Sequence, residues 1–235
     1  MRALVLAIVA CVLAACASQP PISAERAAAI VASPDRSEAD RKNDLRRKPA
    51  EMLAFIGVRE GMVALDVSAG GGYTTELIAR AVGPTGRVYG QTRAPDPRQR
   101  LAQRKIGNIV PVVRPFEDPA PPEVAFDLVT LMFNYHDFGH MGVDRAKANA
   151  AIFRALKPGG MYVIADHSGR PGTGISESNT LHRIEEAFLR KEVEAAGFRL
   201  VAEGGFLRNP NDPRDRETPD PSQPKDEFVL KFVKP

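Results

Sequence analysis

The chain of 235 residues contains no tryptophan and only two cysteines, Cys11 and Cys16. Both cysteines lie near the N-terminus, so the rest of the chain has no thiol. This distribution excludes disulfides, a cysteine nucleophile and a thiolate metal site from everything that follows Cys16. A chain without thiols is also compatible with an oxidising compartment.

A large excess of charge of one sign is also missing. The 32 basic and 29 acidic residues give a formal net charge of +3, and the lysines and arginines are scattered along the chain. We therefore expect no nucleic-acid partner. The hydrophobic fraction of 43% and the charged fraction of 26% are ordinary for a globular protein. The length favours one α/β domain with a substantial core.

The apolar run "ALVLAIVACVLAA", which begins at Ala3, is too short to span a bilayer comfortably but suits the core of a signal peptide. It leads into "LAAC", ending at Cys16, and this pattern resembles the lipobox of bacterial lipoproteins. We predict that residues 1–16 are a lipoprotein signal peptide. The protein would then be exported and held on the membrane by a lipid on Cys16, facing the periplasm. Simple cleavage after the small residues and an uncleaved anchor are the alternatives.

Seven short apolar segments are predicted to be strands, and most are continuous enough to be covered on both faces. Helical patterns separate the early strands, which indicates a doubly wound, mostly parallel sheet. A polar, proline-rich connection separates the last two, so these should form an antiparallel hairpin. We predict a seven-stranded Rossmann-like α/β domain over residues 45–235, preceded by a tether with one helix over 17–44. The predicted strands are VALDV, GRVYGQT, NIVPVV, FDLVTLMF, GMYVIADH, FRLVAEG and EFVLKFV.

Three consecutive glycines, Gly70, Gly71 and Gly72, follow the first predicted strand, which ends near Asp66. In an open parallel sheet, such a turn lies at the carboxyl edge where ligands bind. Glycines let backbone N–H groups approach a ligand closely, and the start of the following helix favours anionic groups. The turn therefore predicts a binding site.

From about Arg47 onward, the chain resembles class I S-adenosylmethionine-dependent methyltransferases, in a branch of predicted exported bacterial methyltransferases. "DVSAGGG" matches the first family motif, although Ser68 replaces its first glycine. "ALKPGGMYVIADH" and "EVEAAGFRLVAEG" match later family segments in the expected order. The resemblance implies S-adenosylmethionine as the cofactor. It places the following residues at the binding turn: Asp66, Ser68, Gly70, Gly71 and Gly72.

The same resemblance implies three further cofactor-binding residues. Gln91 stands where the family usually has an acidic residue for the ribose hydroxyls. The acidic residue that contacts the adenine would be Glu117 or Asp118, of which we choose Asp118. Asn134 resembles the first residue of the Asn-Pro-Pro-Tyr motif of some amino-group methyltransferases, without the prolines. A solvated loop acid is the alternative interpretation of Asp118.

All four histidines lie in three segments that follow predicted strands. We predict catalytic roles for Tyr135, His136, Asp137 and His167, because histidine acts as a base near neutral pH and strand ends face the substrate. A surface position is the preferred interpretation of His140. Three imidazoles and a carboxylate would suit zinc or iron. The sequence shows no histidine pair on a predicted helix, so we predict no metal site.

Three hypotheses remain. The first is a lipid-anchored or exported S-adenosylmethionine-dependent methyltransferase that acts on an unknown small molecule or envelope component. The second is a non-catalytic ligand-binding or accessory lipoprotein that kept the methyltransferase fold. The third is a metal-dependent enzyme that uses the same pocket.

Overall fold

The computed structural model describes residues 20–96, 98, 100–217 and 224–235. The predicted signal peptide, residues 1–16, and its Cys16 lie outside the described residues. Among the helices of the described part, none has both the length and the apolar character needed to cross a bilayer.

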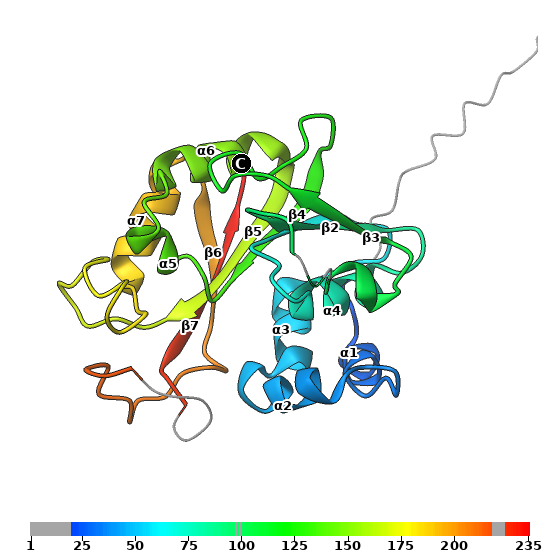
Figure 1. Cartoon of the computed structure of the whole chain (residues 1–235), viewed down its shortest axis with the longest axis horizontal. Coiled ribbons are helices and arrows are strands. Elements are labelled where there is room, and N and C mark those ends of the chain that lie inside the picture. Colours follow the sequence, from blue (N-terminus) through cyan, green and yellow to red (C-terminus); the bar gives the residue numbers. More distant parts are fainter. Residues whose placement is uncertain (1–19, 97, 99, 218–223) are drawn as a thin grey trace, which may run out of the picture.

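A single seven-stranded sheet forms the centre of the molecule, in the order β3-β2-β1-β4-β5-β7-β6 (Figure 1). The first five strands pair in parallel, whereas β7 runs antiparallel to both β5 and β6. This confirms the predicted sheet and its antiparallel hairpin. The strands are β1 (Val63–Val67), β2 (Arg87–Thr92), β3 (Ile109–Val113), β4 (Phe126–Met132), β5 (Leu156–His167), β6 (Arg199–Gly204) and β7 (Glu227–Val233).

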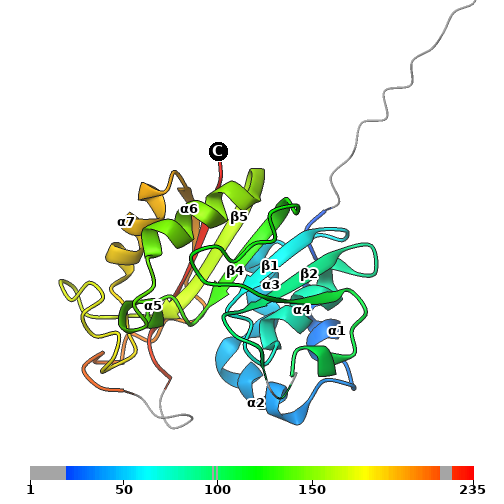
Figure 2. The same ribbon diagram turned by 45° about the horizontal axis from the view of Figure 1, so that its top comes forward.

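Helices cover both faces of the sheet, which explains why the strands are apolar along their whole length (Figures 1 and 2). Side chains alternate between two cores, as in β4, where Leu128 packs in one core and Val129 in the other. Helices α1, α3 and α4 contribute to the first core, and α5, α6 and α7 to the second. The helices are α1 (Ala24–Val31), α2 (Glu38–Arg47), α3 (Pro49–Ile56), α4 (Tyr73–Val82), α5 (Asp137–His140), α6 (Arg145–Ala155) and α7 (Glu186–Ala195).

Helix α2 is absent from the sequence prediction, which places a tether over residues 17–44. Ser37 caps α2 by accepting a hydrogen bond from the N–H of Asp40 at 3.1 Å. Its residues are almost all polar, and only Asp40 is buried, so the apolar spacing that usually predicts a helix is missing. Ion pairs to the domain hold α2 instead: Asp40 pairs with Arg104, and Arg46 pairs with Glu227 of β7 at 2.6 Å.

Three other elements differ from the sequence prediction in extent. The helix predicted over 96–106 is reduced to a short 3-10 turn, η1 (Ala102–Arg104), in its described part. Strand β5 begins at Leu156, four residues before the predicted start. Helix α7 begins at Glu186 because the residues before it form an irregular loop, in which His182 has a φ of 50°.

Candidate functional site

A cavity of about 410 Å³ lies at the carboxyl ends of β1 and β4. Its lining comes from the turn after β1, the first residues of α4, the residues after β4 and one side of α2. This volume is in the range of small-ligand pockets, and the position is the edge of a parallel sheet where ligands bind. The predicted open rim at the glycine turn is therefore present.

Asp66 lies at the buried end of this cavity, as the sequence predicts. Its carboxylate accepts hydrogen bonds from the hydroxyls of Thr75 at 2.6 Å and Thr130 at 2.9 Å. Burial raises the pKa of Asp66 to about 6, although both hydrogen bonds and the positive charge of Arg47 act in the opposite direction. The carboxylate is thus fixed in place by groups from α4 and β4.

The glycine turn adopts the backbone conformation that the sequence predicts. Gly70 and Gly72 have positive φ angles of 54° and 83°, and Ser68 has one of 59°. A Cβ on Gly72 would lie 2.7 Å from Leu101 Cδ1, so this position requires glycine for space as well as for conformation. Ser68, Gly70 and Gly71 line the cavity, whereas Gly72 lies behind it against Leu101.

Asn134 and Phe133 line the cavity from the end of β4. Asn134 Oδ1 accepts a hydrogen bond from Ser68 Oγ at 2.5 Å, which joins the ends of β1 and β4. Phe133 has a φ of 60°, an outlier for a bulky residue, and such strain concentrates at functional sites. Sequence reasoning predicts Asn134 and misses Phe133, because backbone strain leaves no sequence signal.

Helix α2 contributes Asp40, Asn43 and Arg47 to the cavity. The Arg47 guanidinium lies 4.5 Å from the ring centre of Phe133 and 5.3 Å from that of Tyr73. Burial lowers the pKa of Arg47, and its Nε has no hydrogen-bond partner among the described residues. The spacing of three and four residues between these polar side chains marks one helix face, and this is a signal that the sequence analysis missed.

Arg104 also lines the cavity and holds the glycine turn. Its Nε donates a hydrogen bond to the Gly71 carbonyl at 2.8 Å, and its guanidinium also pairs with Glu76 at 2.7 Å and with Asp40. One side chain therefore connects η1, the glycine turn, α4 and α2. No local pattern around Arg104 predicts this role.

Two predicted cofactor-binding residues do not reach the cavity. Gln91 is fully buried, and its amide is used internally: Oε1 accepts the Ser68 N–H at 2.9 Å, and Nε2 donates to the Arg114 carbonyl at 2.6 Å. Asp118 is exposed, pairs with Arg114 and lines a different surface hollow. The prediction for Gln91 is therefore corrected: its side chain supports the glycine turn. Asp118 matches the alternative interpretation, a solvated acid in a loop.

The predicted role of His136 as a neutral base is also corrected. Its Nδ1 lies 2.6 Å from Asp166 Oδ1, and its Nε2 lies 3.0 Å from Asp137 Oδ1. Burial alone would lower its pKa, but the two carboxylates outweigh burial and raise the pKa to about 9. A raised pKa and a carboxylate at each ring nitrogen favour the protonated ring, in which both nitrogens donate.

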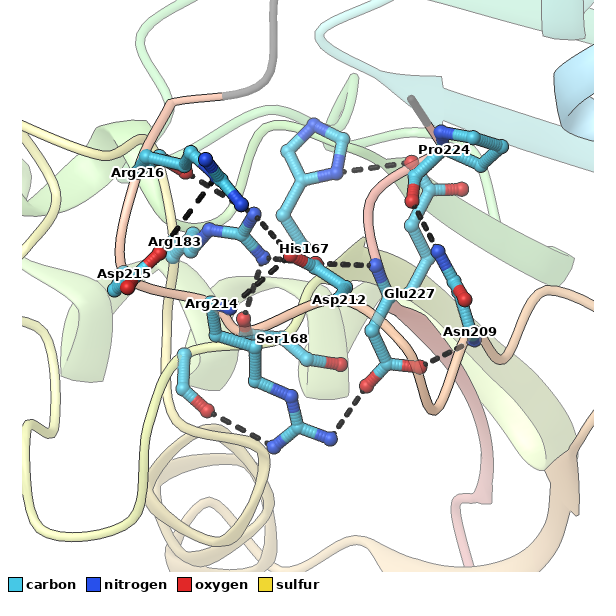
Figure 3. A network of polar contacts seen from close by, with 12 residues as sticks. His167, Ser168, Arg183, Asn209, Asp212, Arg214, Asp215, Arg216, Pro224 and Glu227 are labelled. Atoms are coloured by element: carbon cyan, nitrogen blue, oxygen red, sulfur yellow. Dashed lines mark hydrogen bonds and ion pairs between the residues drawn. The ribbon is translucent and has the colours of Figure 1, made fainter.

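Tyr135 and His167 likewise do not line the cavity. The Tyr135 hydroxyl is buried in the second core, where it donates to Glu192 at 3.0 Å and accepts from Asn149 at 2.9 Å. His167 turns away toward β7, with its Nδ1 3.0 Å from Glu227 Oε1 (Figure 3). Burial lowers the pKa of His167 well below its ordinary value, so this ring is neutral.

Asp137 is hydrogen-bonded to a residue of the cavity lining. Its Oδ2 accepts a hydrogen bond from Asn134 Nδ2 at 2.6 Å. The segment from Asp137 to His140, interpreted from the sequence as a loop, is the one-turn helix α5. The structure therefore brings three histidine rings around Asp137, which the spacing along the chain does not predict.

The comparisons with known proteins agree with this geometry. Residues 65–164 match the family described as "Methyltransferase domain". The chain is 34% identical over 160 residues to the ubiquinone/menaquinone biosynthesis C-methyltransferase UbiE of Hydrogenovibrio crunogenus, covering 66% of this chain and 56% of that protein. It is 30% identical over 155 residues to the UbiE of Marinomonas sp., covering 64% and 57%. The chain thus spans somewhat more than half of these relatives.

Solved structures share the fold at lower identity. A SAM-dependent methyltransferase from Aquifex aeolicus aligns with a TM-score of 0.60 at 17% identity, over 85% of this chain and 100% of that one. The cyclase SpnF aligns with a TM-score of 0.57 at 17% identity, over 80% and 82%. Residues 65–164 thus match a methyltransferase domain, the chain shares the class I methyltransferase fold, and S-adenosylmethionine is the cofactor that these findings support.

Proposed function

We propose that this protein is an S-adenosylmethionine-dependent methyltransferase whose cofactor occupies the cavity between the glycine turn and α2. The single observation that carries this proposal is the cavity of about 410 Å³ beside Asp66 and the glycine turn. A cleft of this size, with a few convergent polar groups at a sheet edge, suits a nucleoside-bearing ligand.

Charged groups in the cavity match the amino-acid portion of the cofactor. Arg47 brings a positive charge to the cavity lining, which suits the cofactor carboxylate. Asp66 and Asn134 also line the cavity and carry acceptor oxygens, which suits the ammonium group and the sulfonium charge of the cofactor.

Alignment is the main catalytic contribution that we propose, because in-line methyl transfer needs the acceptor atom to approach the sulfonium methyl directly. The acceptor is a small molecule or an envelope component. The UbiE relatives are named for carbon methylation, so a ring carbon is one candidate acceptor atom, and an oxygen or nitrogen is the other.

The decisive experiment is calorimetry of the purified protein with S-adenosylmethionine and S-adenosylhomocysteine. We expect saturable binding of both; absence of binding at millimolar ligand would reject the proposal. Transfer of a labelled methyl group to extracts of small molecules and of envelope material would then identify the acceptor class.

We also propose export and lipid attachment at Cys16, on the basis of the "LAAC" pattern that ends the apolar run. Metabolic labelling with a fatty acid tests this proposal. We expect label in the wild-type protein and none in Cys16→Ser. A wild-type protein found unlabelled in the cytoplasmic fraction would contradict it.

One observation favours a second candidate, a binding protein without catalysis. The two acidic or amide groups expected to hold the nucleoside, Gln91 and Asp118, are both outside the cavity. The cyclase SpnF illustrates that this fold accommodates other functions. Tight cofactor binding with no methyl transfer to any extract would support this candidate over the first.

A further inference from the structure

All four histidines of the chain gather beside the carboxyl end of β4 and β5, although they come from three segments. Ring centres are 5.3 Å apart for His136 and His167, and 5.7 Å apart both for His136 and His182 and for His140 and His182. Imidazole side chains scattered over nearly fifty positions do not meet this closely without a common function or a shared counter-charge. This cluster is outside the cofactor cavity.

Asp137 is the common partner of three of these rings. Its Oδ1 lies 3.0 Å from His136 Nε2, 3.0 Å from His182 Nδ1 and 3.8 Å from His140 Nδ1. One ligand atom each from His136, Asp137 and His182 fits within a span of 4.8 Å. A metal with bonds of about 2.0–2.2 Å separates its ligand atoms by roughly 3.0–3.5 Å, so only small shifts are needed.

Neighbouring groups orient these candidate ligands. Asp166 holds His136 through Nδ1 at 2.6 Å and through the backbone N–H at 2.8 Å, which leaves Nε2 directed at Asp137. A histidine that binds metal through one nitrogen usually donates its other N–H to a carboxylate in this way. Asn134 holds the second oxygen of Asp137 at 2.6 Å.

The cluster is also accessible from solvent, as a site that exchanges an ion must be. The side chain of His182 is 38% exposed, that of His140 28% and that of Asp137 20%, whereas His136 lies beneath them at 3%. His182 is held in place with a positive φ of 50°. An ion can therefore enter from the loop between β5 and α7.

We propose that His136, Asp137 and His182 bind a divalent transition-metal ion, beside His140, whose Nδ1 lies 2.9 Å from Ser178 Oγ. Two imidazoles and one carboxylate suit zinc, iron or cobalt, whereas magnesium and calcium prefer sets of oxygen ligands. Without metal, the same groups pair among themselves. The proposal goes beyond methyl transfer and does not depend on cofactor binding, although Asn134 connects the site to Ser68 of the cofactor cavity.

The experiment uses the full protein purified without a histidine tag. Zn²⁺ is titrated by calorimetry, and Co²⁺ by its visible absorption, each in the absence of S-adenosylmethionine. We expect one saturable site, a higher melting temperature with Zn²⁺, and a loss of affinity of about 10–100-fold in His182→Ala and in Asp137→Asn. His182 is the most exposed of the three candidate ligands, so the first of these variants should fold normally.

His167→Asn is the matched control, because His167 lies in the cluster but its Nδ1 faces Glu227. We expect its Zn²⁺ affinity to stay close to that of the wild type. Absence of saturable binding of either metal at millimolar concentration would overturn the proposal, and so would unchanged binding in both His182→Ala and Asp137→Asn. The metal titration contains no S-adenosylmethionine, so a failure to bind S-adenosylmethionine in the separate calorimetric test would not affect the conclusion about the metal site.

Discussion

Two regions at the same edge of the sheet are formed by different kinds of groups. After β1, the cofactor cavity is built from a backbone turn whose glycines keep side chains away. After β4 and β5, the histidine cluster is built from side chains that pair with carboxylates. The first region leaves space beside the turn, where the glycines carry no side chains, whereas in the second region the carboxylates and imidazoles pair with one another.

The two regions are therefore sensitive to different substitutions. A backbone turn is damaged by added volume, because its function depends on empty space. A buried network of charges is damaged by the loss of a partner, because the remaining charge stays buried without compensation. The predictions below test this contrast, beginning with the largest expected effect.

Gly70→Val should reduce affinity for S-adenosylmethionine at least about 100-fold, because the new side chain would enter the cofactor cavity. An added Cβ meets only the Ser68 carbonyl, at 3.9 Å, so the protein has room to fold around it. Gly172→Val is the control: its φ of 81° imposes similar backbone strain, but it lies outside the cavity lining. Calorimetry measures both variants, and equal losses in the two would contradict a steric role for the turn.

Asp166→Asn should lower the free energy of unfolding by about 3 kcal/mol, because it leaves protonated His136 buried without its closest counter-charge. Urea denaturation provides the measurement. Asp118→Asn, which weakens an exposed pair with Arg114, should change the same quantity by less than about 1 kcal/mol. An Asp166→Asn variant with an unchanged free energy of unfolding would show that the cluster does not carry an ionised histidine.

The free energy of unfolding should fall as the pH rises from about 6.5 to about 9. Asp166 and Asp137 overcome burial and raise the pKa of His136 from 6.5 to about 9 in the folded protein. Since the folded pKa exceeds the unfolded value, this stabilisation is complete below pH 6.5 and is lost through pH 9, with a total of roughly 2–3 kcal/mol. Denaturation at a series of pH values should give a sloping profile for the wild type and a flatter one for His136→Asn.

Arg47→Met should weaken S-adenosylmethionine binding about 10-fold, because it removes a charged hydrogen-bond donor but keeps a side chain of similar length against Phe133. Methylthioadenosine, which lacks the amino-acid portion, should bind both proteins equally. Arg41→Met is the control on the same helix, since Arg41 is outside the cavity lining. An equal loss of affinity for S-adenosylmethionine and for methylthioadenosine would contradict the proposal that Arg47 binds the cofactor carboxylate.

Much of the fold could be predicted from local patterns. Continuous apolar strands indicated a sheet covered on both faces, and the proline-rich connection indicated the antiparallel hairpin. Helix α2 could not be predicted by the same reasoning, because its residues are polar and its ion pairs with Arg104 and Glu227 come from distant segments.

The residues of the candidate site also differ in whether a local sequence pattern predicts them. Asp66, Ser68, Gly70 and Gly71 were predictable because a glycine turn after a buried strand has a local signature. Gln91 was placed correctly at a strand end, but the structure turns its amide inward to Ser68 and Arg114. Residue type and position along a strand do not reveal which hydrogen bonds a side chain already makes.

By itself, the sequence determined the class of sheet, the turn that opens it and the cofactor class, because strand pattern and turn chemistry are local properties. Only the tertiary structure decided that α2 covers the cavity with Arg47, that His136 is held protonated between two carboxylates, and that four histidines meet. These features depend on contacts between residues far apart in the chain, and burial and charge at such contacts are set only when the chain folds.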